Sequence, residues 1–169
     1  YKNLDKPFFF FLGFVRPHVP LVAPRKHFEP YQIEKISLPP KVAGDWDDIP
    51  MNAGNRRTSQ NLQMDLEQQK RLIRAYYASV SFIDEMTGKV LKALDESGQR
   101  ENTIVIFTSD HGYHLGEHDL WSKVSIHEES ARVPLIVSVP GHAPVRCRSL
   151  VELLDLYPTH HKLAGRSPP

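Results

Sequence analysis

The longest regular pattern in the sequence is a helical stretch at residues 65–97, and it constrains the fold more than any other feature. Apolar side chains recur there at intervals of three and four residues. Asp65 is suited to the N-cap, Gln68 completes a capping box, and Gly98 is suited to end the helix. Such a helix is about 50 Å long, whereas a globule of 169 residues has a radius of gyration of about 15 Å. We therefore expect the helix to bend near residues 79–81 or to lie along a body larger than this chain.

Short apolar runs at 8–15, 103–109 and 134–139 are typical of buried strands. The first contains four consecutive phenylalanines, which leave no polar face and predict cover on both sides. A weaker run at 151–154 precedes a helix that we expect around 157–164, with an aspartate cap before it and a glycine after it. Alternating strands and helices predict an α/β fold, with a mostly parallel or mixed central sheet flanked by helices.

The 14 prolines divide the chain unevenly, since eight lie between Pro7 and Pro50 and none lies at 51–133. Residues 16–64 carry repeated Pro, Gly and Asn with no sustained period. We expect this stretch to be a long irregular excursion within a single domain that spans 1–169.

Composition excludes several classes of protein. The chain has 21 basic and 20 acidic residues, which argues against a nucleic-acid partner. One cysteine excludes an intrachain disulfide framework and a zinc site built from several cysteines. The longest apolar run, at 8–15, is far shorter than the roughly 20 residues of a membrane span.

Candidate site residues gather where the strands are expected to end. The run 103–109 leads directly into Asp110, His111 and Gly112, and 8–15 leads into Arg16-Pro17-His18. Ligands of open α/β sheets bind beyond the carboxyl ends of the strands, so parallel strands would bring these groups to one rim. Each residue also has a structural interpretation: a turn aspartate, a surface histidine or a solvated lysine at Lys123. The functional interpretation is a site for a divalent metal and an anionic substrate.

Four of the nine histidines lie within 17 residues, at 111–127. Their spacing raises the alternative of catalytic zinc, but Gly112 and Gly116 disfavour a helix there and no His-Glu-x-x-His motif occurs. Cys147 lies between arginines without a base partner in sequence, which favours an ordinary thiol.

Several motifs in order along nearly the whole chain resemble the type I sulfatases of the alkaline phosphatase superfamily. The early segment at 13–20, Gly-Phe-Val-Arg-Pro-His-Val-Pro, is most similar to iduronate-2-sulfatases, and the segment at 129–134, Glu-Ser-Ala-Arg-Val-Pro, is closer to choline sulfatases. Further matching segments include Asn-Thr-Ile-Val-Ile-Phe-Thr-Ser-Asp-His-Gly at 102–112, Leu-Gly-Glu-His at 115–118, Trp-Ser-Lys at 121–123 and Leu-Leu-Asp-Leu-Tyr-Pro-Thr at 153–159.

The resemblance implies roles by position. Asp110 and His111 match ligands of a divalent metal, usually calcium. Lys123 matches the lysine that holds the sulfate oxygens, and His18 matches the histidine near the sulfate and the leaving oxygen, where it acts as a general acid. Tyr113 and His114 occupy positions suited to contact the substrate beyond the sulfate. These two are therefore expected substrate-binding residues, together with His18 and Lys123.

Part of the family's site is absent from this sequence. The family's nucleophile is a formylglycine made from a Cys/Ser-x-Pro/Ala-x-Arg motif; the residues after Cys147 do not fit it, and Ser-Leu-Pro-Pro-Lys at 37–41 is a near miss in the wrong order. The paired N-terminal aspartates of the metal site are also absent. We therefore expect the chain to be a middle-to-late portion of a sulfatase domain, whose partner is the remainder of the same polypeptide.

The expected function is that of a sulfuric ester hydrolase acting on a sulfated carbohydrate or similar ester. The alternatives are a phosphoesterase or phosphonate hydrolase of the same superfamily, and a non-catalytic carbohydrate- or metal-binding domain. The resemblance implies a periplasmic, extracellular or lysosomal location, which no residue of this chain indicates by itself.

Overall fold

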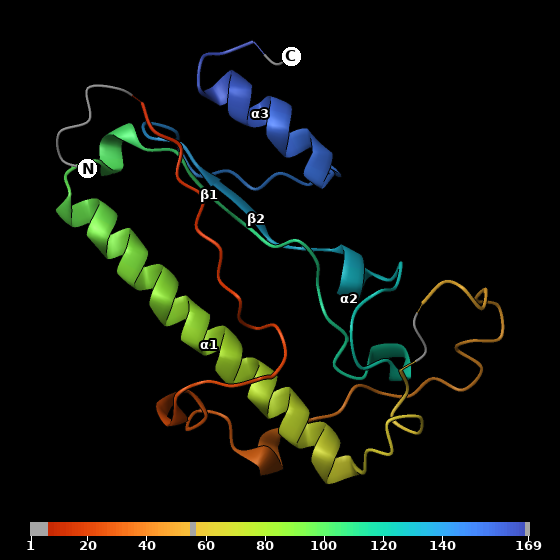
Figure 1. Cartoon of the computed structure of the whole chain (residues 1–169). Helices are drawn as coiled ribbons and strands as arrows, with labels where there is room; N and C mark the ends of the chain where they lie inside the picture. The colour runs from red at the N-terminus through yellow and green to blue at the C-terminus, as the bar shows by residue number, and fades with distance from the viewer. Residues whose placement is uncertain (1–6, 55–56, 168–169) are drawn as a thin grey trace.

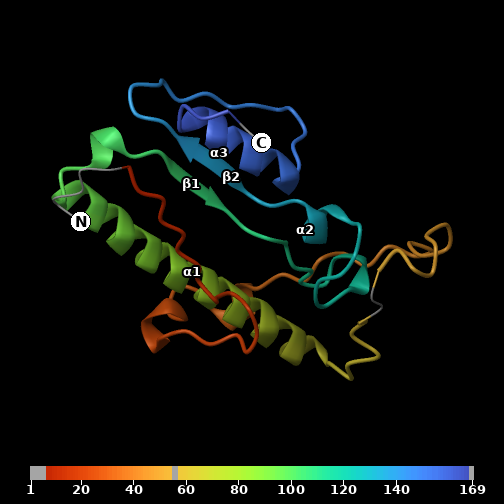
Figure 2. The same ribbon diagram turned by 45° about the horizontal axis from the view of Figure 1, so that its top comes forward.

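The computed structural model describes residues 7–54 and 57–167. Helices and strands alternate along the described chain, and α1 and α3 lie to either side of the small sheet (Figures 1 and 2). The expected α/β class is thus confirmed. The elements are α1 (Leu66–Glu96), β1 (Val105–Thr108), α2 (Glu128–Ala131), β2 (Leu135–Ser138) and α3 (Leu156–Leu163), with short 3-10 helices at Arg25–His27, Ile33–Lys35, Arg100–Asn102, Glu117–Asp119 and Leu153–Asp155.

Helix α1 forms where the sequence predicts it, with both predicted ends. The backbone N–H of Gln68 donates to Asp65 Oδ1 at 2.7 Å, and the N–H of Asp65 donates to Gln68 Oε1 at 2.9 Å, which completes the capping box. Gly98 follows the helix with φ 71°, a conformation that glycine adopts without strain. The helix runs unbroken for 31 residues through 79–81, along the length of the molecule (Figure 1).

The core lies on the N-terminal half of α1. Ile73 is 1% exposed and packs with Ile36, Leu115 and Trp121. The irregular stretch before the helix wraps this half, as shown by the 2.5 Å hydrogen bond between Tyr31 Oη and Ser81 Oγ. Loops that precede and follow α1 in the sequence therefore meet on one face of the helix.

The sheet is an antiparallel pair of strands. Val105 lies opposite Ser138 and Thr108 lies opposite Leu135. Parallel pairing with a crossover was expected and is not what these two strands adopt. A crossover is usually made by a helix, and the only α-helix between β1 and β2 in the described chain is the four-residue α2. The chain therefore turns back beside β1.

The strand expected at 8–15 is wrong for the described chain. This segment runs between α1 and β1 (Figures 1 and 2) but is not assigned as a strand. Phe9 is 78% and Phe11 84% exposed. A strand requires a neighbour for its backbone hydrogen bonds, and β1 bonds to β2 instead.

The C-terminal prediction is half right. Residues 151–154 do not form a strand, since Leu153–Asp155 is a 3-10 helix. The predicted helix is present as α3, with Asp155 at the N-cap and Gly165 at φ 68° after it. No helix in the described part of the chain is long and apolar enough to cross a membrane.

Candidate functional site

Asp110 and His111 follow β1 after a single residue, Ser109, so the predicted position beyond a strand end is observed although the strand is shorter than the run 103–109. The side chain of Asp110 is 86% exposed, and its Oδ1 accepts the backbone N–H of His111 at 3.1 Å. Asp110 Oδ2 lies 3.8 Å from His111 Nε2. A carboxylate oxygen and an imidazole nitrogen thus lie close together at the exposed end of the strand.

Lys123 reaches this pair from a separate loop. Its Nζ lies 2.8 Å from His111 Nε2, while His111 Nδ1 lies 2.7 Å from the carbonyl oxygen of Gly112. The carbonyl only accepts, so Nδ1 carries the proton and Nε2 accepts from the lysine. The structure therefore brings Asp110, His111 and Lys123 into one group.

Gly112 allows the loop to approach α2 closely. Its N–H donates to the Ser130 carbonyl at 2.8 Å. A Cβ at position 112 would overlap with the carbonyl oxygen of Glu129. Only glycine fits here, because the backbone after His111 lies against the backbone of α2.

The backbone at Lys123 is also constrained. The N–H of His114 donates to the Ser122 carbonyl at 2.7 Å, which ties the two loops together. Val124 has φ 73°, a left-handed conformation that is strained for a β-branched residue. The backbone directly after Lys123 is therefore held in a strained conformation.

Tyr113 lies on the loop that follows β1, and its side chain packs against the core. Its ring stacks on Tyr76 of α1, with centroids 5.4 Å apart and an interplanar angle of 27°. Burial raises the pKa of Tyr113, and the charge of Arg57 and a hydrogen bond with Ser122 partly offset that rise. The stack therefore joins α1 to the loop that carries Asp110 and His111.

His114 is buried, with 1% exposure. Its Nε2 lies 2.7 Å from Ser125 Oγ, and its Nδ1 has no hydrogen-bond partner among the residues that the structure describes. Burial lowers the pKa of His114, and Glu129 and Glu117 partly offset that effect. The ring faces the protein interior in this arrangement.

The histidines at 111–127 divide into two groups: His111 bonds with Lys123, and the other three lie together. His118 and His127 stack at 4.2 Å between centroids, and His114 lies 5.9 Å from His127. Asp45 Oδ2 lies 2.9 Å from His118 Nδ1, and Trp46 Nε1 donates to the His118 carbonyl at 2.8 Å. Sequence reasoning missed these two partners from the excursion, because nothing local indicates a contact across more than 70 residues.

His18 lies in the proline-flanked segment and is exposed. Its Nδ1 donates to the Val19 carbonyl at 2.7 Å, and Arg16 Nη1 donates to the His18 carbonyl at 2.8 Å. These contacts hold the ring within its own segment. They do not join it to Asp110, so the structure does not assemble His18 with the other site residues.

The donor atoms of Asp110 and His111 fit part of a metal site. Oxygen ligands suit calcium, and a neutral imidazole with its lone pair on Nε2 suits a divalent ion. Among residues 7–54 and 57–167, no group of three or more His, Cys, Asp or Glu side chains is arranged to hold a metal. Within the described residues, this group offers Asp110 and His111 as ligand side chains.

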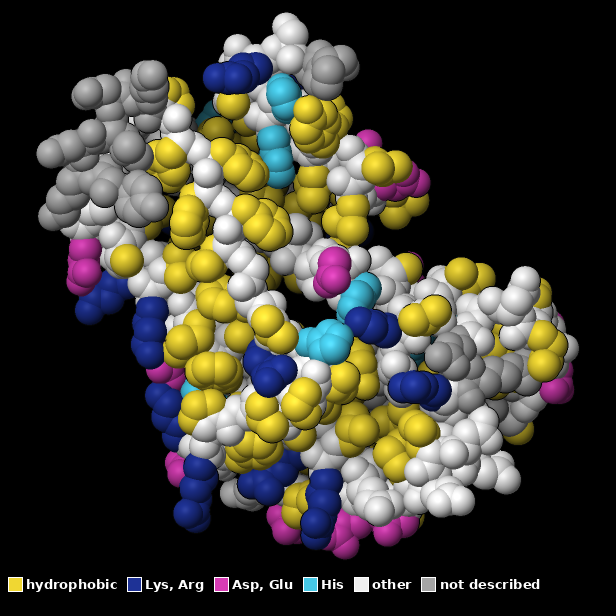
Figure 3. All heavy atoms as spheres, viewed as in Figure 1, with side chains coloured by type: hydrophobic (Ala, Val, Ile, Leu, Met, Phe, Trp, Pro, Cys, Tyr) yellow, Lys and Arg dark blue, Asp and Glu magenta, His cyan; other side chains and the backbone are white. Residues whose placement is uncertain are grey.

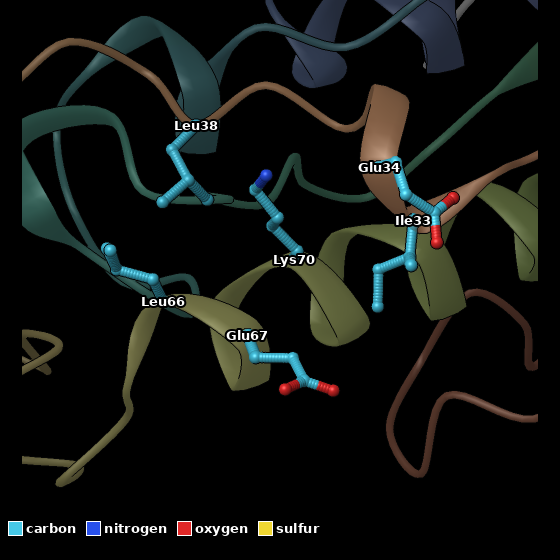
Figure 4. Close-up of a pocket in the computed structure, with 6 residues that line it drawn as sticks. All are labelled: Ile33, Glu34, Leu38, Leu66, Glu67 and Lys70. Carbon is cyan, nitrogen blue, oxygen red and sulfur yellow. The ribbon is translucent and has the colours of Figure 1, made fainter.

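One face of the molecule has a hollow in its surface. Histidine, acidic and basic side chains surround a hollow on the face shown in Figure 3. A separate open groove of about 470 Å³ lies beside the start of α1 (Figure 4). It contains none of the predicted site residues and is therefore not the site that the sequence predicts. The groove is lined by Ile33, Glu34, Leu38, Leu66, Glu67 and Lys70.

Comparison with known proteins gives a family match over residues 1–166, to the family model described as Sulfatase. A sulfatase of Formosa agariphila is 39% identical over 97% of this chain and 34% of its own length. Mouse iduronate 2-sulfatase is 34% identical over 97% of this chain and 37% of its length, and a choline-sulfatase of Rhizobium meliloti is 35% identical over 96% and 32%. The chain thus spans about a third of the length of the curated relatives it matches.

A solved structure has the same arrangement. The phosphonate monoester hydrolase SpPMH of Silicibacter pomeroyi superposes with a TM-score of 0.73 and 28% identity, over 91% of this chain and 33% of the other. The described elements therefore form part of a larger known fold.

Proposed function

Because this chain belongs to the sulfatase family, we propose that the protein that contains it hydrolyses sulfate esters, with a sulfated carbohydrate as the substrate class. One observation carries the proposal: Lys123 lies on the Asp110–His111 pair at the exposed end of β1. A cation beside two metal-binding groups suits a tetrahedral oxyanion. The name of the mouse relative, iduronate 2-sulfatase, supports a sugar ester.

Asp110 and His111 would hold a divalent ion, with calcium as our first choice. When bound, the ion supplies positive charge to the sulfate oxygens. Its remaining ligands, and the formylglycine nucleophile, are expected outside these 169 residues. We therefore expect the isolated chain to be inactive and to bind metal weakly.

Lys123 has the role of stabilising negative charge on the transferring sulfate. His18 has the role of delivering a proton to the leaving alcohol oxygen. Its Nδ1 is already engaged with the Val19 carbonyl, so Nε2 is the atom that exchanges the proton. Tyr113 and His114 remain proposed contacts beyond the sulfate, although in this arrangement their rings face Tyr76 and Ser125.

The test is the release of sulfate from a sulfated monosaccharide by the full-length protein, measured by ion chromatography. We expect Lys123→Met and His18→Ala each to lower kcat/KM by about 100-fold or more, as for loss of an oxyanion donor or a general acid. Lys162→Met on α3 and His142→Ala in an exposed loop are matched controls and should retain activity. Wild-type turnover without sulfate release, or unchanged turnover by Lys123→Met, would contradict the proposal.

Phosphonate or phosphate ester hydrolysis is the second candidate, since the structural match to SpPMH favours it. Sulfate and phosphate esters share tetrahedral geometry. Paired substrates with one alcohol, as sulfate, phosphate and methylphosphonate esters, separate the two. A higher kcat/KM for the phosphorus esters would replace the sulfatase proposal.

A further inference from the structure

We propose that Lys123 and the divalent ion compete for a single atom, Nε2 of His111, so that binding of the ion releases Lys123 toward the anionic substrate. This inference rests on the proposed function, because it takes His111 as a metal ligand. It adds an order of binding: the ion first, then the anion.

The tautomer of His111 makes the two partners exclusive. Because Nδ1 donates to the Gly112 carbonyl at 2.7 Å, the lone pair of the neutral ring is on Nε2. Lysine has no acceptor, so the 2.8 Å contact between Lys123 Nζ and Nε2 is an N–H···N bond. That lone pair serves either an ammonium proton or a metal ion.

The other ligand atom is already beside this nitrogen. Asp110 Oδ2 lies 3.8 Å from Nε2, and the Asp110 side chain is 86% exposed. Lys123 is therefore the group that an ion must displace from His111 Nε2. The Asp110 carboxylate is exposed and can reach an ion without the displacement of any buried group.

The lysine side chain, rather than its loop, is free to change partner. The bond from His114 N–H to the Ser122 carbonyl holds the backbone just before Lys123. The ammonium group forms no ion pair with any carboxylate of the described residues, and His111 is the partner that the structure gives it. Once displaced, it carries an unpaired charge that a sulfate oxygen can compensate. Ion and anion binding should therefore each strengthen the other.

The closing experiment measures Ca²⁺ and Mn²⁺ affinity by calorimetry in the full-length protein, without substrate. Lys123→Met should bind the ion about tenfold tighter, equivalent to removal of one competing hydrogen bond from a charged donor. Arg57→Met is the matched control: it also removes a cation near this loop, since Arg57 acts on Tyr113 and its carbonyl accepts the Trp121 N–H. A gain in Lys123→Met no larger than in Arg57→Met would overturn the competition.

His111→Ala separates this inference from the proposed function. If His111→Ala leaves ion affinity unchanged, the ligand assignment of the proposed function fails. If it weakens binding while Lys123→Met matches the control, only the competition fails.

Nitrogen-15 spectra of the His111 ring in the wild-type protein give a second readout. We expect Nδ1 to be protonated, and Nε2 to shift on addition of Ca²⁺. Inorganic sulfate should bind more tightly when Ca²⁺ is present. This gain in sulfate affinity should be smaller in Lys123→Met than in the wild type. Protonation on Nε2, or an equal gain in the variant, would overturn the proposal.

Discussion

Two regions of this molecule treat their apolar side chains in opposite ways. The closed region is the N-terminal half of α1 with the loops at 27–38 and 113–121, where Ile73 and Trp121 are 1% and 3% exposed. The open region comprises 8–15, β1, β2 and α3, where the aromatic and aliphatic side chains lie on the surface. Examples are Phe11 at 84%, Ile136 at 59% and Tyr157 at 58%.

The difference lies in the reach of the contacts rather than in composition. The loops of the closed region return to α1 and bury its face within the described chain. In the open region, few loops of the described chain fold back over the apolar runs, and the sheet has two strands. Apolar surface of that extent is unusual on a soluble monomer. The Asp110–His111–Lys123 group lies at the boundary, between β1 and the loops of the closed region.

The largest expected effect breaks the closed region. Ile73→Ala should lower the free energy of unfolding by about 2–5 kcal/mol, because it removes a fully buried side chain and leaves a cavity. Urea unfolding followed by circular dichroism measures this. A loss below 1 kcal/mol would mean that this core does not hold the chain together.

Gly112→Ala should act at the boundary between the regions. The added methyl meets the Glu129 carbonyl oxygen, a backbone atom, so the loop or α2 must shift. We expect a cost of about 1–3 kcal/mol, together with weaker metal binding in the full-length protein. Gly88→Ala in α1, where nothing lies within 4 Å of the added methyl, is the control and should be neutral or stabilising. Equal metal affinity in both variants would show that Gly112 does not position His111.

A smaller effect should appear as a pH dependence of the closed region. Burial holds the pKa of His114 below its ordinary 6.5, so the unfolded chain binds its proton more readily than the folded chain. Stability is therefore complete above pH 6.5 and falls as the pH is lowered through that value toward the folded pKa. His114→Gln should flatten this part of the unfolding profile, while exposed His142→Gln should leave its slope unchanged.

The smallest expected effect on stability comes from the open region. Phe11→Ser should change the unfolding free energy by less than about 0.5 kcal/mol, because the ring is already in solvent. It should nevertheless lower the binding of a hydrophobic dye and slow self-association. A loss comparable to that of Ile73→Ala would show that the two regions do not differ as described.

Local patterns predicted the parts of the fold that depend on near neighbours. The capping box of Asp65 and Gln68, the glycine after α1 and the placement of Asp110 at the end of β1 all follow from residues a few positions apart. Such hydrogen bonds and periodicities form within one element. The same reasoning failed at 8–15, because a strand exists only with a neighbour to accept its backbone hydrogen bonds.

The sequence by itself determined α1 with its ends, the α/β alternation and the succession of Asp110, His111 and Lys123 along the chain. The tertiary structure decided how the histidines divide: His111 bonds with Lys123, whereas His114, His118 and His127 pack with Ser125, Asp45 and Trp46. Residue type and spacing are the same before and after folding. Which lone pair meets which donor depends on loops brought together across long sequence separations, and packing against α1 sets those positions.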